Sequence, residues 1–70
     1  MTLEKDYTVL FVGEYFSLTG NVTTTNTNPS DIVFEALTFM KEYYGWGNLE
    51  EVSEQIIVRD SDGEEIWEEE

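Results

Sequence analysis

Carboxylates are the only chemically active side chains that this sequence carries in number. Of its 70 residues, 16 are Asp or Glu and three are Lys or Arg, which gives a net charge of −13. It has no Cys and no His, which excludes disulfides, thiolate nucleophiles, the usual zinc sites and imidazole acid–base catalysis. Paired carboxylates can catalyse proton transfer when they are buried, but these gather near a terminus and on a polar helix face. We therefore expect no enzymatic activity, no cofactor and no metal site.

One short segment resembles part of a calcium-binding loop, because Asp60 and Asp62 alternate in front of Gly63. Aligning Gly63 with the glycine of an EF-hand loop puts Val58 at the first ligand position, where an acid is required. No helices are predicted on either side of the segment. We therefore interpret residues 60–63 as a type I hairpin turn in which Gly63 supplies the positive φ.

The acids are concentrated toward the end of the sequence. Residues 50–70 contain ten acids and one Arg, a net charge of −9, whereas residues 1–49 have a net charge of −4. A field of this sign repels nucleic acid and anionic membranes, so we expect neither as a direct partner. It favours a basic protein surface or divalent cations as partners, and it also keeps a small, apolar-rich domain in solution.

One row of acids is predicted on a strand at residues 64–68. Successive side chains of a strand point to opposite sides. One side would carry Glu64, Glu68 and Glu70, and the other would carry Glu65, Trp67 and Glu69. Whichever side packs on the core, at least two carboxylates project outward.

A second row of acids lies on a helix predicted at about 29–44. Asn28 fits its N-cap, Pro29 its first position, and Gly45 the left-handed residue that ends it. At 100° per residue, one wide arc of this helix is apolar, which suits a helix lying on a sheet. The arc contains Ile32, Val33, Ala36, Leu37, Phe39, Met40, Tyr43 and Tyr44. The opposite face carries Asp31, Glu35 and Glu42.

Aromatic residues are interspersed with these acids at Phe34, Trp46 and Trp67. Phe34 falls outside the apolar arc and beside Lys41. It is either a boundary residue covered by the lysine stem or a partner contact. The candidate partner-binding residues are Asp31, Phe34, Glu35, Glu42, Glu64, Glu65, Trp67, Glu68 and Glu69.

Strands are predicted at about 6–18, 21–26, 53–60 and 64–68. Gly13 interrupts the first strand, as a bulge or as the first residue of a tight turn, and Thr19–Asn21 is the stronger turn signal before the second. A single helical turn capped by Asn48 is predicted after the long helix. The order β-β-α-β-β predicts one α+β domain over residues 1–70, an antiparallel sheet with one helix packed across one face.

Residues 7–12 are largely apolar on both faces of the first strand. A strand of this kind is normally buried on both sides, and the one long helix can cover only one of them. A homodimer that packs sheet to sheet is the simplest cover for the other face.

Two features bear on location. The longest apolar run, Val9–Val12, is far too short to span a bilayer. The first six residues have neither the basic nor the apolar part of a secretion signal, so we expect a cytoplasmic protein.

In size, in element order over residues 6–68 and in the acidic run Glu50–Glu70, the chain resembles small acidic proteins of phages and mobile elements that inhibit host nucleic-acid enzymes. These include DNA mimics and some anti-restriction and anti-CRISPR proteins. The resemblance implies an inhibitor whose carboxylates imitate a phosphate backbone and dock in the basic groove of a nucleic-acid-binding host protein. These groups share no sequence motif, so no residue role is carried over.

Two alternatives remain open. The chain could be a structural or accessory domain that oligomerises through its apolar sheet face, with the acids serving solubility. It could also be a buffer of divalent ions, which would bind calcium and be stabilised by it.

Overall fold

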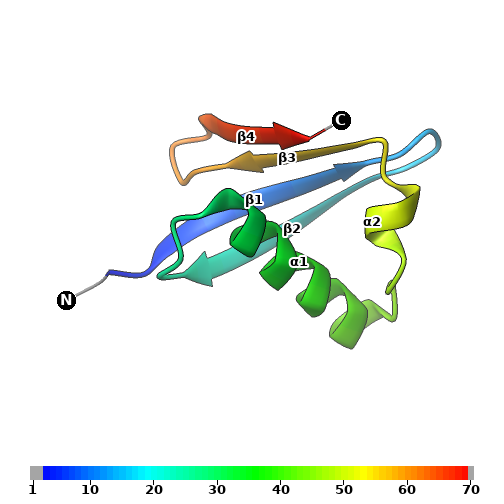
Figure 1. The fold of residues 1–70 in the computed structure, drawn as a ribbon, viewed down its shortest axis with the longest axis horizontal. Helices are drawn as coiled ribbons and strands as arrows, with labels where there is room; N and C mark the ends of the chain where they lie inside the picture. Colours follow the sequence, from blue (N-terminus) through cyan, green and yellow to red (C-terminus); the bar gives the residue numbers. More distant parts are fainter. Residues whose placement is uncertain (1–2, 70) are drawn as a thin grey trace.

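Four strands and two helices make up the described part of the chain (Figure 1). The computed structural model describes residues 3–69, and for Glu68 and Glu69 it describes the backbone alone. The elements are β1 (Lys5–Val12), β2 (Ser17–Thr24), α1 (Pro29–Tyr44), α2 (Leu49–Val52), β3 (Gln55–Arg59) and β4 (Glu65–Glu69). The sheet order is β2-β1-β3-β4, with every neighbouring pair antiparallel. With α1 packed on one face, this is the predicted α+β fold.

The core lies between α1 and one face of the sheet. Side chains of β1 alternate between the two faces, and Val9 and Phe11 are fully buried on the helix side. Val58 of β3 and Ile32 of α1 are fully buried with them in one cluster. Burying an apolar side chain of this size contributes on the order of 2 kcal/mol. These four residues therefore hold the helix and the sheet together.

The other face of the sheet is covered by no described element. Leu10 of β1 and Ile57 of β3 are neighbours on this face, and Val12 lies on it two residues further along β1. All three are half-buried. The sheet-to-sheet homodimer that would cover them stays a prediction.

Helix α1 is closed at both ends by the residues that the sequence indicates. The Asn28 side-chain oxygen accepts the Ser30 backbone N–H at 3.1 Å, and Pro29 occupies the first helical position. At the other end Gly45 has φ of 74° and donates its N–H to the Lys41 carbonyl oxygen at 3.0 Å. The caps fix where the helix starts and stops, and so which of its residues reach the sheet.

The first hairpin turns earlier than predicted. The turn occupies residues 13–16, where the Gly13 N–H donates to the Phe16 carbonyl oxygen at 2.9 Å, and β2 runs straight through Thr19–Asn21. The predicted turn at Thr19–Asn21 is therefore wrong. Gly20 serves another purpose: a Cβ added to it would lie 3.0 Å from Met40 Cε. The glycine lets α1 approach β2 closely.

The second hairpin is the turn predicted at residues 60–63. Asp60 Oδ1 accepts the backbone N–H groups of Asp62 and Glu64, and Gly63 has φ of 84°. The ladder then shifts register, so that Trp67 pairs with Val58 but Glu65 pairs with Arg59.

This β-bulge corrects one predicted position on the last strand. Because of the shift, Glu65 lies on the face of Arg59, away from the face of Trp67 where strict alternation placed it.

The helical turn α2 forms as predicted, but Asn48 makes no side-chain cap hydrogen bond.

Replacing Gly20 tests the close approach of α1 to β2. Gly20→Val should lower the free energy of unfolding by about 1–3 kcal/mol, because its side chain must displace Met40. Thr19→Val, at an exposed position of the same strand, should change it by less than about 0.5 kcal/mol. Urea unfolding followed by tryptophan fluorescence measures both. Equal effects would contradict the placement of Gly20 beneath the helix.

Candidate protein-binding surface

The outward side of α1 carries the acids that the sequence assigns to it. Asp31 and Glu42 are exposed. Glu35 is half-buried, because its Oε2 accepts a hydrogen bond from Asn26 Nδ2 at 3.0 Å. This bond connects α1 to the linker that follows β2.

Phe34 interrupts this row and is open to solvent. Its side chain is 69% exposed, so the lysine stem does not cover it. The stem of Lys41 packs near Gly47 instead, where an added Cβ would lie 3.6 Å from Lys41 Cγ. The first of the two interpretations of Phe34 is therefore wrong. We call Asp31, Phe34, Glu35 and Glu42 the acidic face of α1.

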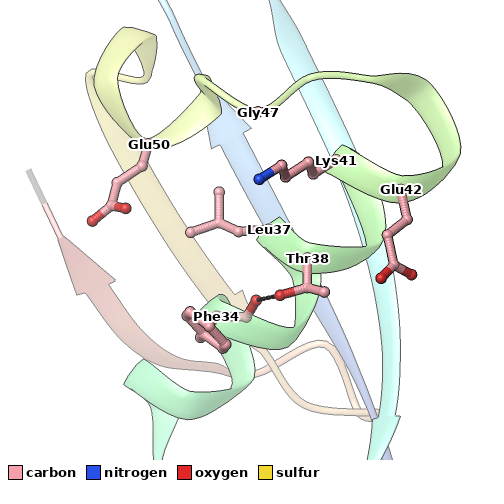
Figure 2. A pocket seen from close by; sticks show the side chains of 7 residues that line it. All are labelled: Phe34, Leu37, Thr38, Lys41, Glu42, Gly47 and Glu50. Atoms are coloured by element: carbon pink, nitrogen blue, oxygen red, sulfur yellow. Dashed lines mark hydrogen bonds between the residues drawn. The ribbon is translucent and has the colours of Figure 1, made fainter.

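A hollow of about 510 Å³ lies between α1 and the segment that begins α2. Figure 2 shows Phe34, Leu37 and Lys41 along the α1 side of this hollow and Glu50 on the α2 side. The hollow thus joins one exposed ring to a cation and a carboxylate. It is open and mixed in polarity, which is typical of the rim of a protein interface rather than of an enclosed ligand pocket.

The C-terminal part of α1 and the loop after it carry a cluster of four rings, three of which the sequence places in the core. Phe39, Tyr43 and Tyr44 are 37%, 71% and 56% exposed. Phe39 stacks on Tyr43 with ring centroids 4.4 Å apart, and Tyr44 stacks on Trp46 with centroids 4.8 Å apart. We call these four residues the aromatic cluster.

The position of α1 on the sheet explains this exposure. Met40 is the last buried residue of α1, and in Figure 1 the C-terminal end of the helix continues beyond β2. Helical periodicity assigns a direction to a side chain but does not say whether a sheet lies there. Three residues of the predicted apolar arc are consequently on the surface, and sequence reasoning missed the aromatic cluster. The signal that could have found it is the dense run of rings between Phe39 and Trp46.

The second predicted row lies elsewhere. Glu64 and Glu65 are exposed at the β3–β4 hairpin, and Trp67 is half-buried against the core. The side chains of Glu68 and Glu69 lie outside the described part of the chain. β4 is one edge strand of the sheet, while α1 packs most closely on β2, the other edge strand (Figure 1). The two acidic rows are therefore on different parts of the molecule.

Residues 3–69 were also searched for metal sites and membrane-spanning helices. No group of three or more acids is placed to hold a metal ion there. Neither helix of this part combines the length and the apolar character needed to cross a membrane. Comparison of the chain with protein-family models, with curated proteins and with solved structures finds no match. We therefore infer function from surface chemistry.

Removing the exposed ring of Phe34 should leave the fold intact. Phe34→Ala is expected to change the free energy of unfolding by less than about 0.5 kcal/mol, because the ring contributes little to the core. Ile32→Ala, two residues away and fully buried, should cost about 2–5 kcal/mol. Urea unfolding compares the two. A large loss in Phe34→Ala would show that the ring is structural and remove it from the binding surface.

Proposed function

We propose that this chain is a non-enzymatic acidic binding protein that docks on the basic surface of a nucleic-acid-binding host protein. In its sharper form, it is a phage or mobile-element inhibitor that imitates DNA. The observation that supports this is the acidic face of α1, which combines three carboxylates with an exposed phenylalanine on a chain with a net charge of −13.

The chemistry of that face suits arginine and lysine. Carboxylates attract both cations, and an exposed ring accepts a guanidinium or ammonium group over its face. On an exposed surface each ion pair or cation–π contact contributes on the order of 0.5–1 kcal/mol, so several must act together. The net charge adds long-range attraction, which raises the association rate with a basic partner.

An alternative is supported by a separate observation. The half-buried Leu10, Val12 and Ile57 on the uncovered face of the sheet suit a structural or accessory domain that oligomerises there. In that case the acids serve solubility alone.

Two sets of neutral substitutions test which acidic row binds the partner. Asp31→Asn/Glu35→Gln/Glu42→Gln removes three charges from α1, and Glu64→Gln/Glu65→Gln/Glu68→Gln removes three from the β3–β4 hairpin. The α1 set should weaken capture of a basic nucleic-acid-binding protein from nuclease-treated lysate by about tenfold, since exposed pairs contribute up to about 1 kcal/mol each. The hairpin set, matched in net charge, should have a much smaller effect, and duplex DNA should elute the captured protein.

The outcomes separate the possibilities. Weakening by the hairpin set alone would move the contact to β4 and keep the proposal. Unchanged capture by both sets, or a captured protein that duplex DNA does not displace, would contradict it.

Salt distinguishes the proposal from the alternative. Docking driven by charge should weaken steeply between about 0.05 M and about 0.5 M NaCl. Added salt shortens the Debye length, so the exposed charges of the two proteins attract each other over a shorter distance. Association through Leu10 and Ile57 should persist or strengthen over the same range, since apolar burial is not screened. Isothermal titration with the captured partner, and sedimentation of the chain alone, measure the two cases. Partner affinity that does not change with salt would contradict the mimic.

A further inference from the structure

The β2 edge of the sheet is open to the addition of a strand. β2 is an outermost strand, and its outer side pairs with no strand within residues 3–69. Free edges are normally protected by charge, proline, a bulge or short length. β4, the opposite edge, has three glutamates and a register shift. β2 is eight residues long, has neither charge nor proline, and keeps one register with β1 throughout.

The hairpin determines which backbone groups are available at this edge. The Gly13 N–H donates to the Phe16 carbonyl oxygen, and hydrogen-bonded pairs alternate along an antiparallel ladder. The backbone groups that point away from β1 therefore belong to alternate residues of β2, namely Ser17, Thr19, Asn21 and Thr23. The side chains of these four residues are exposed on the uncovered face of the sheet. Gly20 and Val22, which lie between them, face α1.

The last turns of α1 extend beyond this edge. Gly20 lies beneath Ala36 and Met40, so the helix crosses β2 at that point, and in Figure 1 its C-terminal end continues past the strand. Phe39 and Tyr43 lie here on the β2 side of the buried stripe of the helix, and their rings are stacked. Neighbouring strands of a sheet are about 4.8 Å apart. A strand added to β2 would therefore run beneath these two rings.

Carboxylates lie on the outer side of the same rings. A shallow hollow of about 360 Å³ on this flank of α1 is lined by Phe34, Glu35, Thr38, Phe39 and Glu42, none of which is basic. Figure 2 shows the Lys41 ammonium group pointing away from Glu42, toward the hollow beside α2. A lysine or arginine on the added strand could lay its apolar stem along Phe39 and place its charge at these carboxylates. The flank thus complements an extended segment that is basic on one side.

We infer that the basic partner of this chain contributes an extended segment that pairs antiparallel with β2 as a fifth strand. The inference rests on the proposed function and specifies its contact. Lysine or arginine at alternate positions of the segment faces α1, because successive side chains of a strand point to opposite sides. The residues between them lie beside Thr19 and Asn21 on the uncovered face. A second copy of this chain does not fit, since it would bring its own carboxylates to the same place.

Synthetic peptides test whether strand pairing or charge alone brings the segment to β2. The parent probe is a capped peptide of about ten residues in which lysine alternates with threonine, titrated into the full chain by calorimetry. In the inferred register, its threonines exchange backbone hydrogen bonds with Thr19, Asn21 and Thr23, whereas the backbone groups of its lysines point away from β2. N-methylation of the threonine amides should weaken binding at least about tenfold. N-methylation of the lysine amides, at the same net charge, should leave binding within about twofold of the parent.

Amide hydrogen exchange locates the bound peptide. Saturation with the parent peptide should slow exchange of the outward amides of Thr19, Asn21 and Thr23 at least about tenfold. The amides of Gly20 and Val22 provide the control, because they already point toward β1 and should change much less. Protection at β4 in place of β2, or unchanged exchange at the three outward amides, would overturn the inference.

Two neutral double variants test the part played by the carboxylates. Glu35→Gln/Glu42→Gln removes two charges from the hollow beside Phe39, and Glu50→Gln/Glu51→Gln removes two exposed charges from α2. The first variant should weaken binding of the parent peptide at least about fivefold, and the second less than about twofold. Equal effects would show that only the net charge attracts the peptide and would contradict the inferred position of the lysines.

The outcomes separate this inference from the proposed function. A chain that captures a basic nucleic-acid-binding protein but binds all three peptides equally, or none of them, would overturn the strand pairing alone. A chain that binds the parent peptide with the expected dependence on its threonine amides, but captures no such protein, would overturn the proposed function alone.

Discussion

Packing of α1 on one face of the sheet is the contact on which the rest of this structure depends. A chain of 70 residues without cysteine has no disulfides, so this one hydrophobic core must offset the conformational entropy that is lost on folding. Phe11, Val9 and Val58 supply the sheet side of this contact and Ile32 the centre of the helix side. Gly20 allows the helix to lie close to β2, because a side chain at this position would meet Met40.

This offset position produces most of the surface features of the molecule. Toward β3 it leaves the hollow lined by Phe34, Leu37 and Lys41. Toward β2 it carries the end of the helix past the sheet, so that Tyr43 and Tyr44 stay in solvent. With only one long helix among the described residues, nothing in that part of the chain covers the second face of the sheet. A small domain with a single layer contact necessarily exposes apolar groups elsewhere.

Charge is distributed unevenly over the surface. The acidic face of α1 and the β3–β4 hairpin repel like-charged molecules and attract basic ones, and they lie on different parts of the fold. β2 and the linker after it carry no charge at all. The attraction of such a surface for a basic partner weakens as ionic strength rises.

Local features of the chain were predictable because their causes are local. The caps at Asn28 and Gly45 depend on backbone geometry that neighbouring residues specify, and so does the turn from Asp60 to Gly63. The alternation of Val9 and Phe11 likewise marks a strand wherever it packs. The exposure of Phe34 also follows from its own place on the helix.

The sequence-based predictions were wrong where the role of a residue depends on contacts with a distant part of the chain. Gly20 resembles a turn residue until Met40 is seen above it, and the bulge beside Arg59 moves Glu65 to the other face. The sequence by itself determined the order of elements, the long helix with its caps, and the total charge. Only the tertiary structure decided between Gly13 and Thr19–Asn21 as the site of the first hairpin turn, which rings stay exposed and how far apart the acidic rows lie. The exposure of the rings depends on where α1 rests on the sheet, and the separation of the acidic rows depends on the strand order as well; contacts between distant residues set both.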